Sequence, residues 1–148
     1  HVTVRCLFCY ILSDALRVVR RFSAETERFI AFVPFFAHYP YEVHIYARDH
    51  KSSLSDLDYD DKLNLARLLK VILEKYDRLW GFSLPYIMVM HQKPTDGKPY
   101  PGYHFHIEFY PPNRTKEKLK YLAGTEVGAQ TFVNDTLPEE KAAELRQV

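Results

Sequence analysis

The feature that most constrains the fold is a long amphipathic pattern in the middle of the chain. Apolar residues recur three and four positions apart from Leu65 to Leu79, which places them on one face of a helix of about six turns. Asp58 can cap the first turn, and Gly81 can end the helix in the left-handed conformation. The apolar face is predicted to hold Leu65, Leu68, Leu69, Ile72, Tyr76 and Leu79.

Two short strands are predicted before this helix. Residues 29–33 form an apolar run that Pro34 stops. Residues 42–48 alternate, with Val43, Ile45 and Ala47 on one face and Glu42, His44, Tyr46 and Arg48 on the other.

Two more strands are predicted after the helix. Residues 86–91 are a continuous apolar run, which indicates a strand buried on both faces and ending at His91. A loop rich in turn-forming residues follows at 93–99, and residues 103–110 then alternate until Pro111 and Pro112 end the strand.

The C-terminal part is predicted to be helical. A helical segment is expected to begin at Thr115 and to end at Gly124, and Thr136 with Glu139 has the spacing of a capping box for a last short helix. Strands on both sides of one long helix predict an α+β fold with a mainly antiparallel sheet.

Composition excludes several classes of partner. The 148 residues are 47% apolar, so a single domain over residues 1–148 is expected. The net charge of +1, with scattered lysines and arginines, favours neither nucleic acid nor a membrane surface as partner. There is no apolar run near the roughly 18 residues of a membrane span and no signal-peptide layout, so a cytoplasmic protein with a small-molecule or subunit partner is predicted.

The two cysteines point to metal binding. Cys6 and Cys9 are separated by two residues, which favours a metal or redox pair in a reducing compartment, although such a pair can also form a small apolar turn. His50 follows the second predicted strand, and His104 begins the last one. If these side chains meet, they form the Cys₂His₂ set of a closed structural zinc site.

The last strand is the second candidate site. Its alternation places His104, His106 and Glu108 on one face. This face can simply meet solvent, or it can be functional, because adjacent imidazoles resist joint protonation and suit neutral ligand or nucleophile roles.

His91 has two interpretations as well. A lone histidine on an apolar strand is commonly a hydrogen-bonded core residue. If its strand pairs antiparallel with residues 103–110, however, His91 lies beside His106 or Glu108. The mixed nitrogen and oxygen ligands would then suit a harder metal such as iron, with a fourth ligand from elsewhere.

Polar residues after the last strand form a third candidate. Lys120, Thr125 and Glu126 can be solvated surface. Alternatively, Lys120 can hold a phosphate as a point charge, and Glu126 can accept hydrogen bonds from sugar hydroxyls.

Several segments, in this order, resemble the second half of galactose-1-phosphate uridylyltransferases. They are residues 29–37, 40–44, 85–86, 91–94, 106–112 and 118–126. The resemblance implies a histidine-triad-like half-barrel of antiparallel strands, crossed by one long helix and followed by a helical C-terminal tail. It also implies transfer of UMP between UDP-glucose and galactose 1-phosphate through a uridylylated histidine.

The resemblance places that nucleophile outside this chain. In the family it lies in an H-P-H-x-Q motif of the first half, which this sequence lacks, so no catalytic residue is expected here. Because the chain begins at His1 and not at Met, we expect a fragment or a processed product that lacks its N-terminal half.

The resemblance assigns metal and substrate binding to this half, which is expected to work in a homodimer. The residues that match substrate contacts, to UDP-glucose or UDP-galactose and hexose 1-phosphate, are Lys120, Tyr121, Ala123, Thr125 and Glu126, while Phe132 falls where the family often has glutamine. His91 and His106 match two histidines of a second metal site, and Glu108 replaces a third. Cys6, Cys9, His50 and His104 are similar in spacing to the zinc site of many bacterial histidine-triad proteins.

Two other functions remain open. One is a free-standing histidine-triad hydrolase with His106 as nucleophile, but Glu108 then stands where a hydrogen-bond donor to the leaving group is usual. The other is a non-catalytic dimerisation or binding module whose interface is formed by Phe35, Phe36, Tyr39 and Tyr41.

Overall fold

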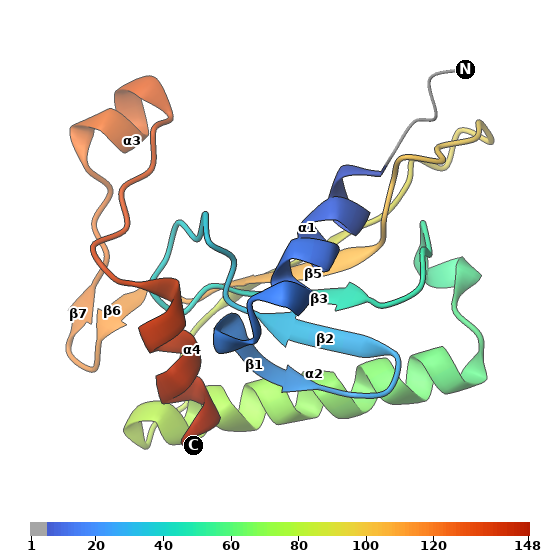
Figure 1. Cartoon of the computed structure of the whole chain (residues 1–148). Helices are drawn as coiled ribbons and strands as arrows, with labels where there is room; N and C mark the ends of the chain where they lie inside the picture. The colour runs from blue at the N-terminus through green and yellow to red at the C-terminus, as the bar shows by residue number, and fades with distance from the viewer. Residues whose placement is uncertain (1–5) are drawn as a thin grey trace.

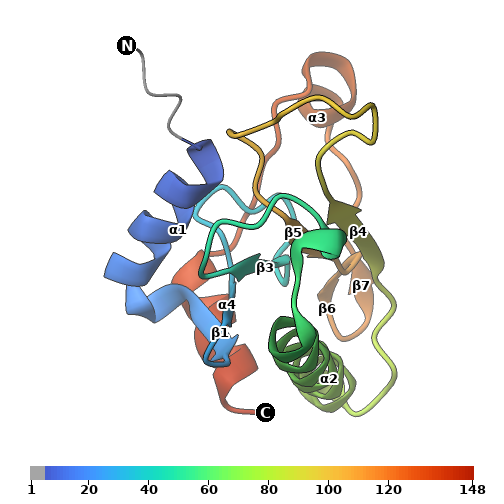
Figure 2. The same ribbon diagram turned by 90° about the vertical axis from the view of Figure 1, so that its right-hand side faces the viewer.

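A five-stranded antiparallel sheet organises the computed structural model, which describes residues 6–148. Its strand order is β1-β2-β3-β5-β4. The strands are β1 (Phe22–Glu25), β2 (Phe29–Phe32), β3 (Val43–Ala47), β4 (Ile87–His91) and β5 (His106–Tyr110). Helix α1 (Leu7–Arg17) and helix α2 (Tyr59–Trp80) lie on opposite faces of the sheet (Figure 1, Figure 2).

The remaining elements are short. Two 3₁₀ turns, η1 (Val19–Arg21) and η2 (Leu54–Asp56), precede β1 and α2. After β5 come the hairpin β6 (Asn113–Thr115) and β7 (Lys118–Leu119), then α3 (Gly124–Ala129) and α4 (Pro138–Arg146). Helix α3 projects away from the sheet, whereas α4 packs against β1 and α2 (Figure 1).

The predicted central helix is confirmed together with both of its ends. Asp58 and Asp61 form a reciprocal capping box, and Gly81 ends the helix at φ 74°. Leu68 and Ile72 are at most 1% exposed and pack against the sheet. Each such side chain contributes about 1.5–3 kcal/mol through its burial.

The two faces of the sheet bury different kinds of side chain. The face toward α2 carries the apolar residues Val43, Ile45 and Ala47 of β3 and Ile107 and Phe109 of β5, as the alternation predicted. The face toward α1 also contains apolar side chains, and the smaller cluster there consists of Leu12, Ala15, Ile30, Phe32 and Tyr46. The polar side chains of β3 and β5 lie on this second face, where His44 and His106 are buried and Glu108 and Tyr110 are partly exposed.

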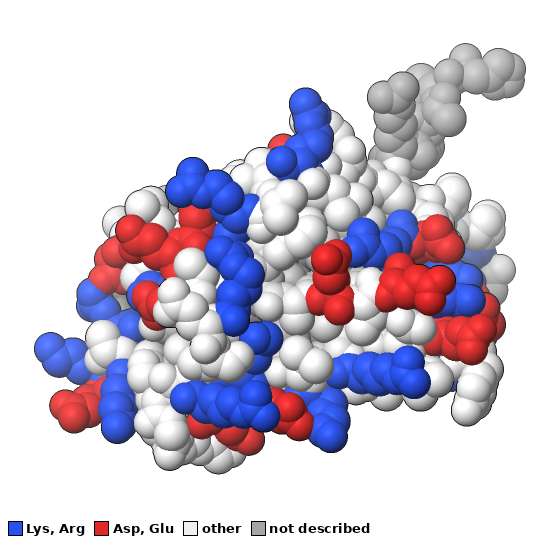
Figure 3. Space-filling model, turned by 60° about the horizontal axis from the view of Figure 1, so that its bottom comes forward, with Lys and Arg blue, Asp and Glu red and all other residues white. Residues whose placement is uncertain are grey.

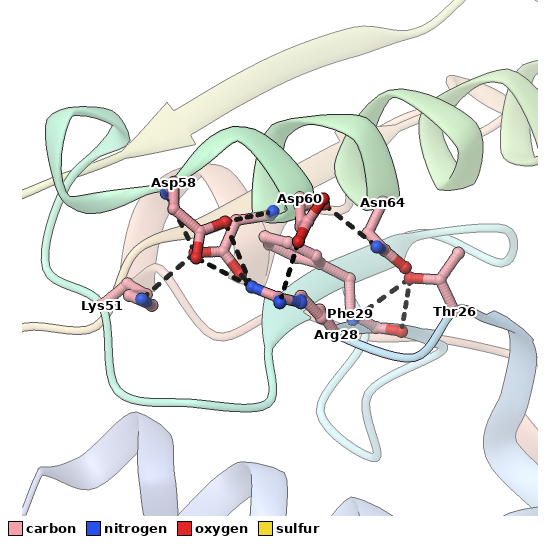
Figure 4. Close-up of polar contacts among 8 residues, drawn as sticks. Thr26, Arg28, Phe29, Lys51, Asp58, Asp60 and Asn64 are labelled. Carbon is pink, nitrogen blue, oxygen red and sulfur yellow. Dashed lines mark hydrogen bonds and ion pairs between the residues drawn. The ribbon is translucent and has the colours of Figure 1, made fainter.

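A charged network fixes the start of α2 relative to the sheet (Figure 4). Arg28, in the turn between β1 and β2, binds Asp58 at 2.9 Å and Asp61 at 3.0 Å, and it approaches Asp60 at 3.4 Å. Lys51 binds the other oxygen of Asp61 at 3.1 Å. Burial by itself would raise the pKa of Asp61, but hydrogen bonds from Arg28 and Lys51 lower it below its ordinary value.

The surface bears both signs of charge. On the face shown in Figure 3, lysine and arginine side chains lie among aspartate and glutamate side chains, and no single sign covers that face. Within residues 6–148, no helix has both the length and the apolar character needed to cross a bilayer.

The prediction that residues 86–91 are buried on both faces is wrong. Among residues 6–148, β4 is an edge strand that is hydrogen-bonded only to β5, and Ile87, Met88 and Met90 are 65%, 42% and 40% exposed. An apolar run indicates burial in a complete sheet, but here neither helix covers this edge.

The predicted helix from Thr115 to Gly124 is also wrong. Residues 113–119 form the β6–β7 hairpin, and Gly124 begins α3. The backbone N–H of Lys120 donates to the carbonyl of Pro112 at 2.7 Å, which closes the hairpin in place of a helical turn. The last helix is confirmed as α4, but Thr136 is bonded to Asn134 and does not cap it, and Pro138 occupies the first turn.

Helix α1 was not predicted from the sequence. Its buried residues are Leu12 and Ala15, and it carries Arg17 in its last turn without a side-chain cap at its start. Because a capping signal is absent, its boundaries depend on packing against Ile30, Phe32 and Tyr46.

We predict that Leu68→Ala lowers the free energy of unfolding by about 2–5 kcal/mol, because it leaves a cavity between α2 and the sheet. Leu63 lies on the same helix, but it is 36% exposed. Leu63→Ala therefore serves as the matched control and should lower the free energy of unfolding much less. Urea unfolding followed by circular dichroism measures both. Equal losses for the two variants would contradict the packing described here.

Candidate functional site

Four predicted metal ligands converge at one end of the sheet. The ligand atoms of Cys6, Cys9, His50 and His104 all lie within 4.8 Å of one another, and we call them the Cys₂His₂ cluster. Cys9 Sγ is 3.2 Å from His50 Nδ1 and 3.3 Å from His104 Nδ1. The fold brings together residues that are up to 98 positions apart, counted from Cys6 to His104.

Local structure explains this convergence. Cys6 precedes the first residue of α1, and Cys9 lies in its first turn. Because β3 and β5 are antiparallel, with Tyr46 opposite His106, the end of β3 that leads to His50 lies beside the start of β5 that follows His104.

The ring of His104 is oriented as a ligand. Its Nε2 donates to the carbonyl of Ala47 at 2.9 Å, so the proton lies on Nε2 and the lone pair of Nδ1 faces the sulfur of Cys9. Burial lowers the pKa of His104 to about 4, which keeps the ring neutral. Burial, with a hydrogen bond to Cys6, raises the pKa of Cys9 to about 11. Without a cation, Cys9 therefore stays a thiol.

A second cluster lies farther along the same face of the sheet. His91 pairs directly opposite His106, and the ligand atoms of His91, His106 and Glu108 lie within 4.8 Å of one another; we call this the His₂Glu cluster. His91 Nε2 is 3.0 Å from Glu108 Oε2, and His106 Nε2 is 3.4 Å from Glu108 Oε1. The rings of His91 and His106 stack with 4.7 Å between centroids.

Contacts with neighbouring residues fix the orientation of the His106 ring. It is 2% exposed, and its Nδ1 donates to the carbonyl of His104 at 2.7 Å. The ring of Phe8, from α1, lies 4.3 Å away, on centroids. The lone pair of Nε2 therefore faces a carboxylate oxygen, and either a second ring proton or a cation must lie between these two acceptors.

The alternative in which this polar face meets solvent is wrong, because His104 and His106 are 0% and 2% exposed. The physical reason is α1, which covers this face. A single-strand pattern shows that one face is polar, but it does not show what lies above that face.

His44 and Tyr110 complete the surroundings of Glu108, and both were missing from the predicted site. His44 Nδ1 is 3.7 Å from Glu108 Oε1, while its Nε2 is 2.8 Å from Glu42. The hydroxyl of Tyr110 donates to Glu108. Burial would raise the pKa of Glu108, but His106, His44 and Tyr110 together lower it to about 2. The alternation of residues 42–48 had already placed His44 on the polar face of its strand. That His44 lies opposite Glu108, however, follows only from the order and register of the strands in the sheet.

The residues matched to substrate contacts lie in and before α3. Lys120 and Glu126 form an ion pair at 2.8 Å, with side chains 8% and 1% exposed. Lys120 also donates to the carbonyls of His38 and, at 2.7 Å, Val133, and Glu126 accepts from the backbone N–H of Ala123. The pair therefore holds the loop in shape, and the direct ligand contacts expected for Lys120 and Glu126 stay predictions.

The other members of this group are exposed. Tyr121 is 84% exposed, and Ala123 and Thr125 also face solvent. Phe132 stacks on His38 with 3.9 Å between ring centroids, and both residues line a cavity of about 430 Å³ with Phe35.

The aromatic interface proposed for a binding module is only partly exposed. Phe35 is 62% exposed, but Tyr41 is 3% exposed and donates to Glu144 at 2.6 Å. These aromatic residues therefore do not form one continuous surface.

Comparisons with known proteins agree with this geometry. Residues 7–148 match the family model described as galactose-1-phosphate uridyl transferase, C-terminal domain. The chain is 41% identical over 144 residues to the galactose-1-phosphate uridylyltransferase of Thermotoga maritima, which covers 97% of this chain and 45% of that protein. The chain thus spans about half the length of the curated relatives it matches.

Solved structures show the same fold. A uridylyltransferase structure matches with a TM-score of 0.88 and 40% identity, and the match covers 98% of this chain and 46% of that chain. An ADP-glucose phosphorylase from Arabidopsis thaliana, with bound ADP-glucose, matches with a TM-score of 0.79 and 27% identity, and the match covers 99% of this chain and 44% of that chain. A hypothetical histidine triad nucleotide-binding protein from Sulfolobus tokodaii shares the fold with a TM-score of 0.65 at 16% identity, and the match covers 96% of this chain and 90% of that chain. The predicted histidine-triad-like α+β fold is confirmed.

We predict that Glu126→Gln weakens the acid sensitivity of the fold. The hydrogen bond from Lys120, with those from backbone N–H groups, lowers the folded-state pKa of Glu126 to about 2 from an ordinary 4.5. Its contribution is therefore present above about pH 4.5 and is lost as the pH falls toward 2. Urea unfolding at several pH values in this range gives the free energy of unfolding as a function of pH. This free energy should fall less steeply with decreasing pH in the variant than in the unmodified chain.

Glu117→Gln, at an exposed position of the β6–β7 turn, is the control for this series. It should leave the slope unchanged. If Glu126→Gln behaves like Glu117→Gln, the ion pair with Lys120 does not contribute in the way described.

Proposed function

The chain belongs to the galactose-1-phosphate uridylyltransferase family, and from this premise we propose that it is the metal-binding and substrate-binding half of an enzyme that moves UMP between UDP-glucose and galactose 1-phosphate. The observation that carries the proposal is the match of residues 7–148 to the C-terminal domain of that family. Nucleotide sugars are accordingly the proposed substrates, and the predicted cytoplasmic location fits their metabolism.

The attacking histidine is proposed to lie in an N-terminal half outside this chain. Its chemistry is nucleophilic: a neutral imidazole nitrogen attacks phosphorus and forms a phosphoramidate, which divides one displacement into two easier steps. Within residues 6–148, His106 is the candidate that the sequence suggested for such a role. Its Nδ1 is bound to a carbonyl, its ring lies beside Phe8 and His91, and Glu108 lies in front of Nε2. This environment suits a ligand better than a nucleophile.

The same contacts disfavour the free-standing histidine-triad hydrolase. Phosphate oxygens approaching His106 would meet Glu108, whose low pKa keeps it ionised at neutral pH. The hydrolase alternative would need a hydrogen-bond donor at that place, and the carboxylate offers none.

The exposed edge of the sheet supports a partner half. In the part of the chain that the structure describes, no strand pairs with the outer edge of β4, and this edge also carries the exposed side chains of Ile87, Met88 and Met90. Edges of this kind are normally covered, because they otherwise pair with other chains. We assign this edge to contact with the missing half.

A homodimer is proposed for the projecting segment around α3. Tyr121, Leu122, Val127 and Val133 are between 47% and 84% exposed on this segment. A segment that projects from the sheet and exposes apolar groups can reach a neighbouring subunit, where Tyr121, Ala123 and Thr125 would contact the nucleotide sugar (Figure 1). The Lys120–Glu126 ion pair would keep the loop in the shape needed for that contact.

Zinc fits the Cys₂His₂ cluster. Two thiols and two imidazoles lie within 4.8 Å of one another, and the Nδ1 lone pair of His104 is already directed at Cys9. This is the donor set of closed, structural zinc sites, in which zinc stabilises the thiolates and joins distant segments. Here Cys6, Cys9, His50 and His104 would hold it and join α1 to one end of the β3–β5 pair, where β3 ends and β5 begins.

A second metal is proposed for the His₂Glu cluster. His91, His106 and Glu108 supply two nitrogens and a carboxylate, which suit a harder ion such as iron. The acceptor atoms of His106 and Glu108, which face each other at 3.4 Å, support a cation between them.

For the zinc proposal, we expect the reduced, purified chain to contain about one zinc per molecule by elemental analysis. Cys6→Ser combined with Cys9→Ser should lose it, because two of four ligands are removed. His91→Gln, which changes only the second cluster, is the control and should keep the zinc. Stoichiometric zinc in the double serine variant would refute the site.

For the catalytic proposal, we expect no covalent uridylyl adduct when the chain alone is incubated with UDP-glucose and examined by intact mass. The reason is that the nucleophile belongs to the other half. An adduct that forms on the chain and disappears in His106→Gln would instead support the hydrolase-like alternative.

A further inference from the structure

Cys6 and Cys9 have a geometry that also allows a disulfide. Cys6 immediately precedes α1 and Cys9 lies in its first turn, so their Cα atoms are about 5 Å apart by helix geometry. This separation lies inside the range found for disulfides. Their sulfurs are within 4.8 Å of each other, and rotation of the side chains is enough to join them. They are the only two cysteines of the chain.

The pair is accessible to a small oxidant. Cys6 is buried, but Cys9 is partly exposed and its neighbour in the cluster, His50, is exposed. A hydroperoxide can therefore reach the sulfur of Cys9 from the side of His50, whereas Cys6 is placed to resolve the product.

The first turn of α1 also covers the His₂Glu cluster. Phe8 lies between the two cysteines in sequence, and its ring contacts His106 at 4.3 Å, Tyr46 at 6.0 Å and Tyr103 at 6.2 Å, measured between centroids. Farther along the helix, Leu12 and Ala15 anchor it in the core independently. The turn that carries Phe8 is tied to His50 and His104 through Cys9.

His104 connects the two clusters by a second route. Its Nδ1 faces Cys9, and its backbone carbonyl accepts the hydrogen bond that orients His106. His104 therefore contacts Cys9 through its ring and orients His106 through its backbone carbonyl, so a change at Cys9 can reach His106 through this one residue.

We propose that Cys6 and Cys9 form a redox latch: a hydroperoxide joins them in a disulfide, zinc is released, and the turn of α1 over His106 is freed. The zinc-bound thiolate of Cys9 attacks the peroxide, breaking its O–O bond, to give a sulfenic acid and water or an alcohol. The thiolate of Cys6 then displaces hydroxide from that sulfur. Two sulfurs lose two electrons, the peroxide gains them, and two protons from solvent complete the water or alcohol and the second water.

Loss of zinc follows because a disulfide sulfur is a poor ligand, which leaves only His50 and His104. Leu12 and Ala15 keep the rest of α1 in place, so the change is confined to its first turn. A thiol reductant and zinc should restore the closed form. The latch rests on the zinc site proposed above.

The test begins with the zinc content of the reduced full chain, measured before any oxidant is added. Hydrogen peroxide is then added in the presence of a chromogenic zinc chelator. We expect release of one zinc per chain, in step with a Cys6–Cys9 disulfide detected by peptide mass. Carbethoxylation of His106 by diethyl pyrocarbonate, read on the same digest, should rise several-fold upon oxidation.

Cys6→Asp is the matched control, because aspartate caps a helix and binds zinc but forms no disulfide. Zinc release from this variant should be at least about tenfold slower at equal peroxide, a difference of about 1.4 kcal/mol in activation free energy. A reduced chain without zinc overturns the zinc site and the latch together. Zinc that is present but stays bound during peroxide treatment, or release without the disulfide, overturns the latch alone.

Discussion

The position of β5 between β3 and β4 is the constraint on which both candidate metal clusters depend. This register sets Glu108 opposite His44 on one side, and it sets His106 opposite His91 on the other. Because side chains alternate along a strand, a shift of one residue would turn the histidines of β5 toward α2 and its apolar core. The buried apolar residues Ile107 and Phe109 oppose such a shift, so the packing against α2 indirectly positions the ligands.

Covering the polar face of the sheet has an electrostatic consequence. Once α1 lies over β3 and β5, the imidazoles and carboxylates there must find partners among themselves or in a cation, because an unpaired buried charge is costly. Glu42, His44, Glu108 and His106 accordingly form one chain of polar contacts. The Cys₂His₂ cluster lies at the edge of this region, and its candidate ligands come from both α1 and the segments next to β3 and β5. The proposed metal binding and the covering of the histidine face are therefore parts of one arrangement.

The two edges of the sheet differ in how they are covered. β1, at one edge of the sheet, is partly covered by α4, whose Arg146 donates to the carbonyls of Arg20 and Phe22. β4, at the opposite edge, has no such cover among the described residues and exposes apolar side chains. This difference between the two edges agrees with a chain that spans 45% of its Thermotoga maritima relative. The segment around α3 adds a second exposed apolar surface.

Local periodicity in the sequence determined α2 with both of its ends, the strands β2, β3 and β5, and the separation of polar from apolar residues along β5. The sequence also identified the candidate ligands by their chemistry, both those of the Cys₂His₂ cluster and those of the His₂Glu cluster. The tertiary structure alone decided that β4 is an exposed edge, that α1 buries the polar face, and that His44 belongs beside Glu108. It also decided that Lys120 is bound to Glu126 and that a hairpin replaces the expected helix before Gly124. The physical reason is that spacing along the chain reports which way each side chain points, whereas strand order, cover and ion pairing depend on contacts between residues far apart in sequence.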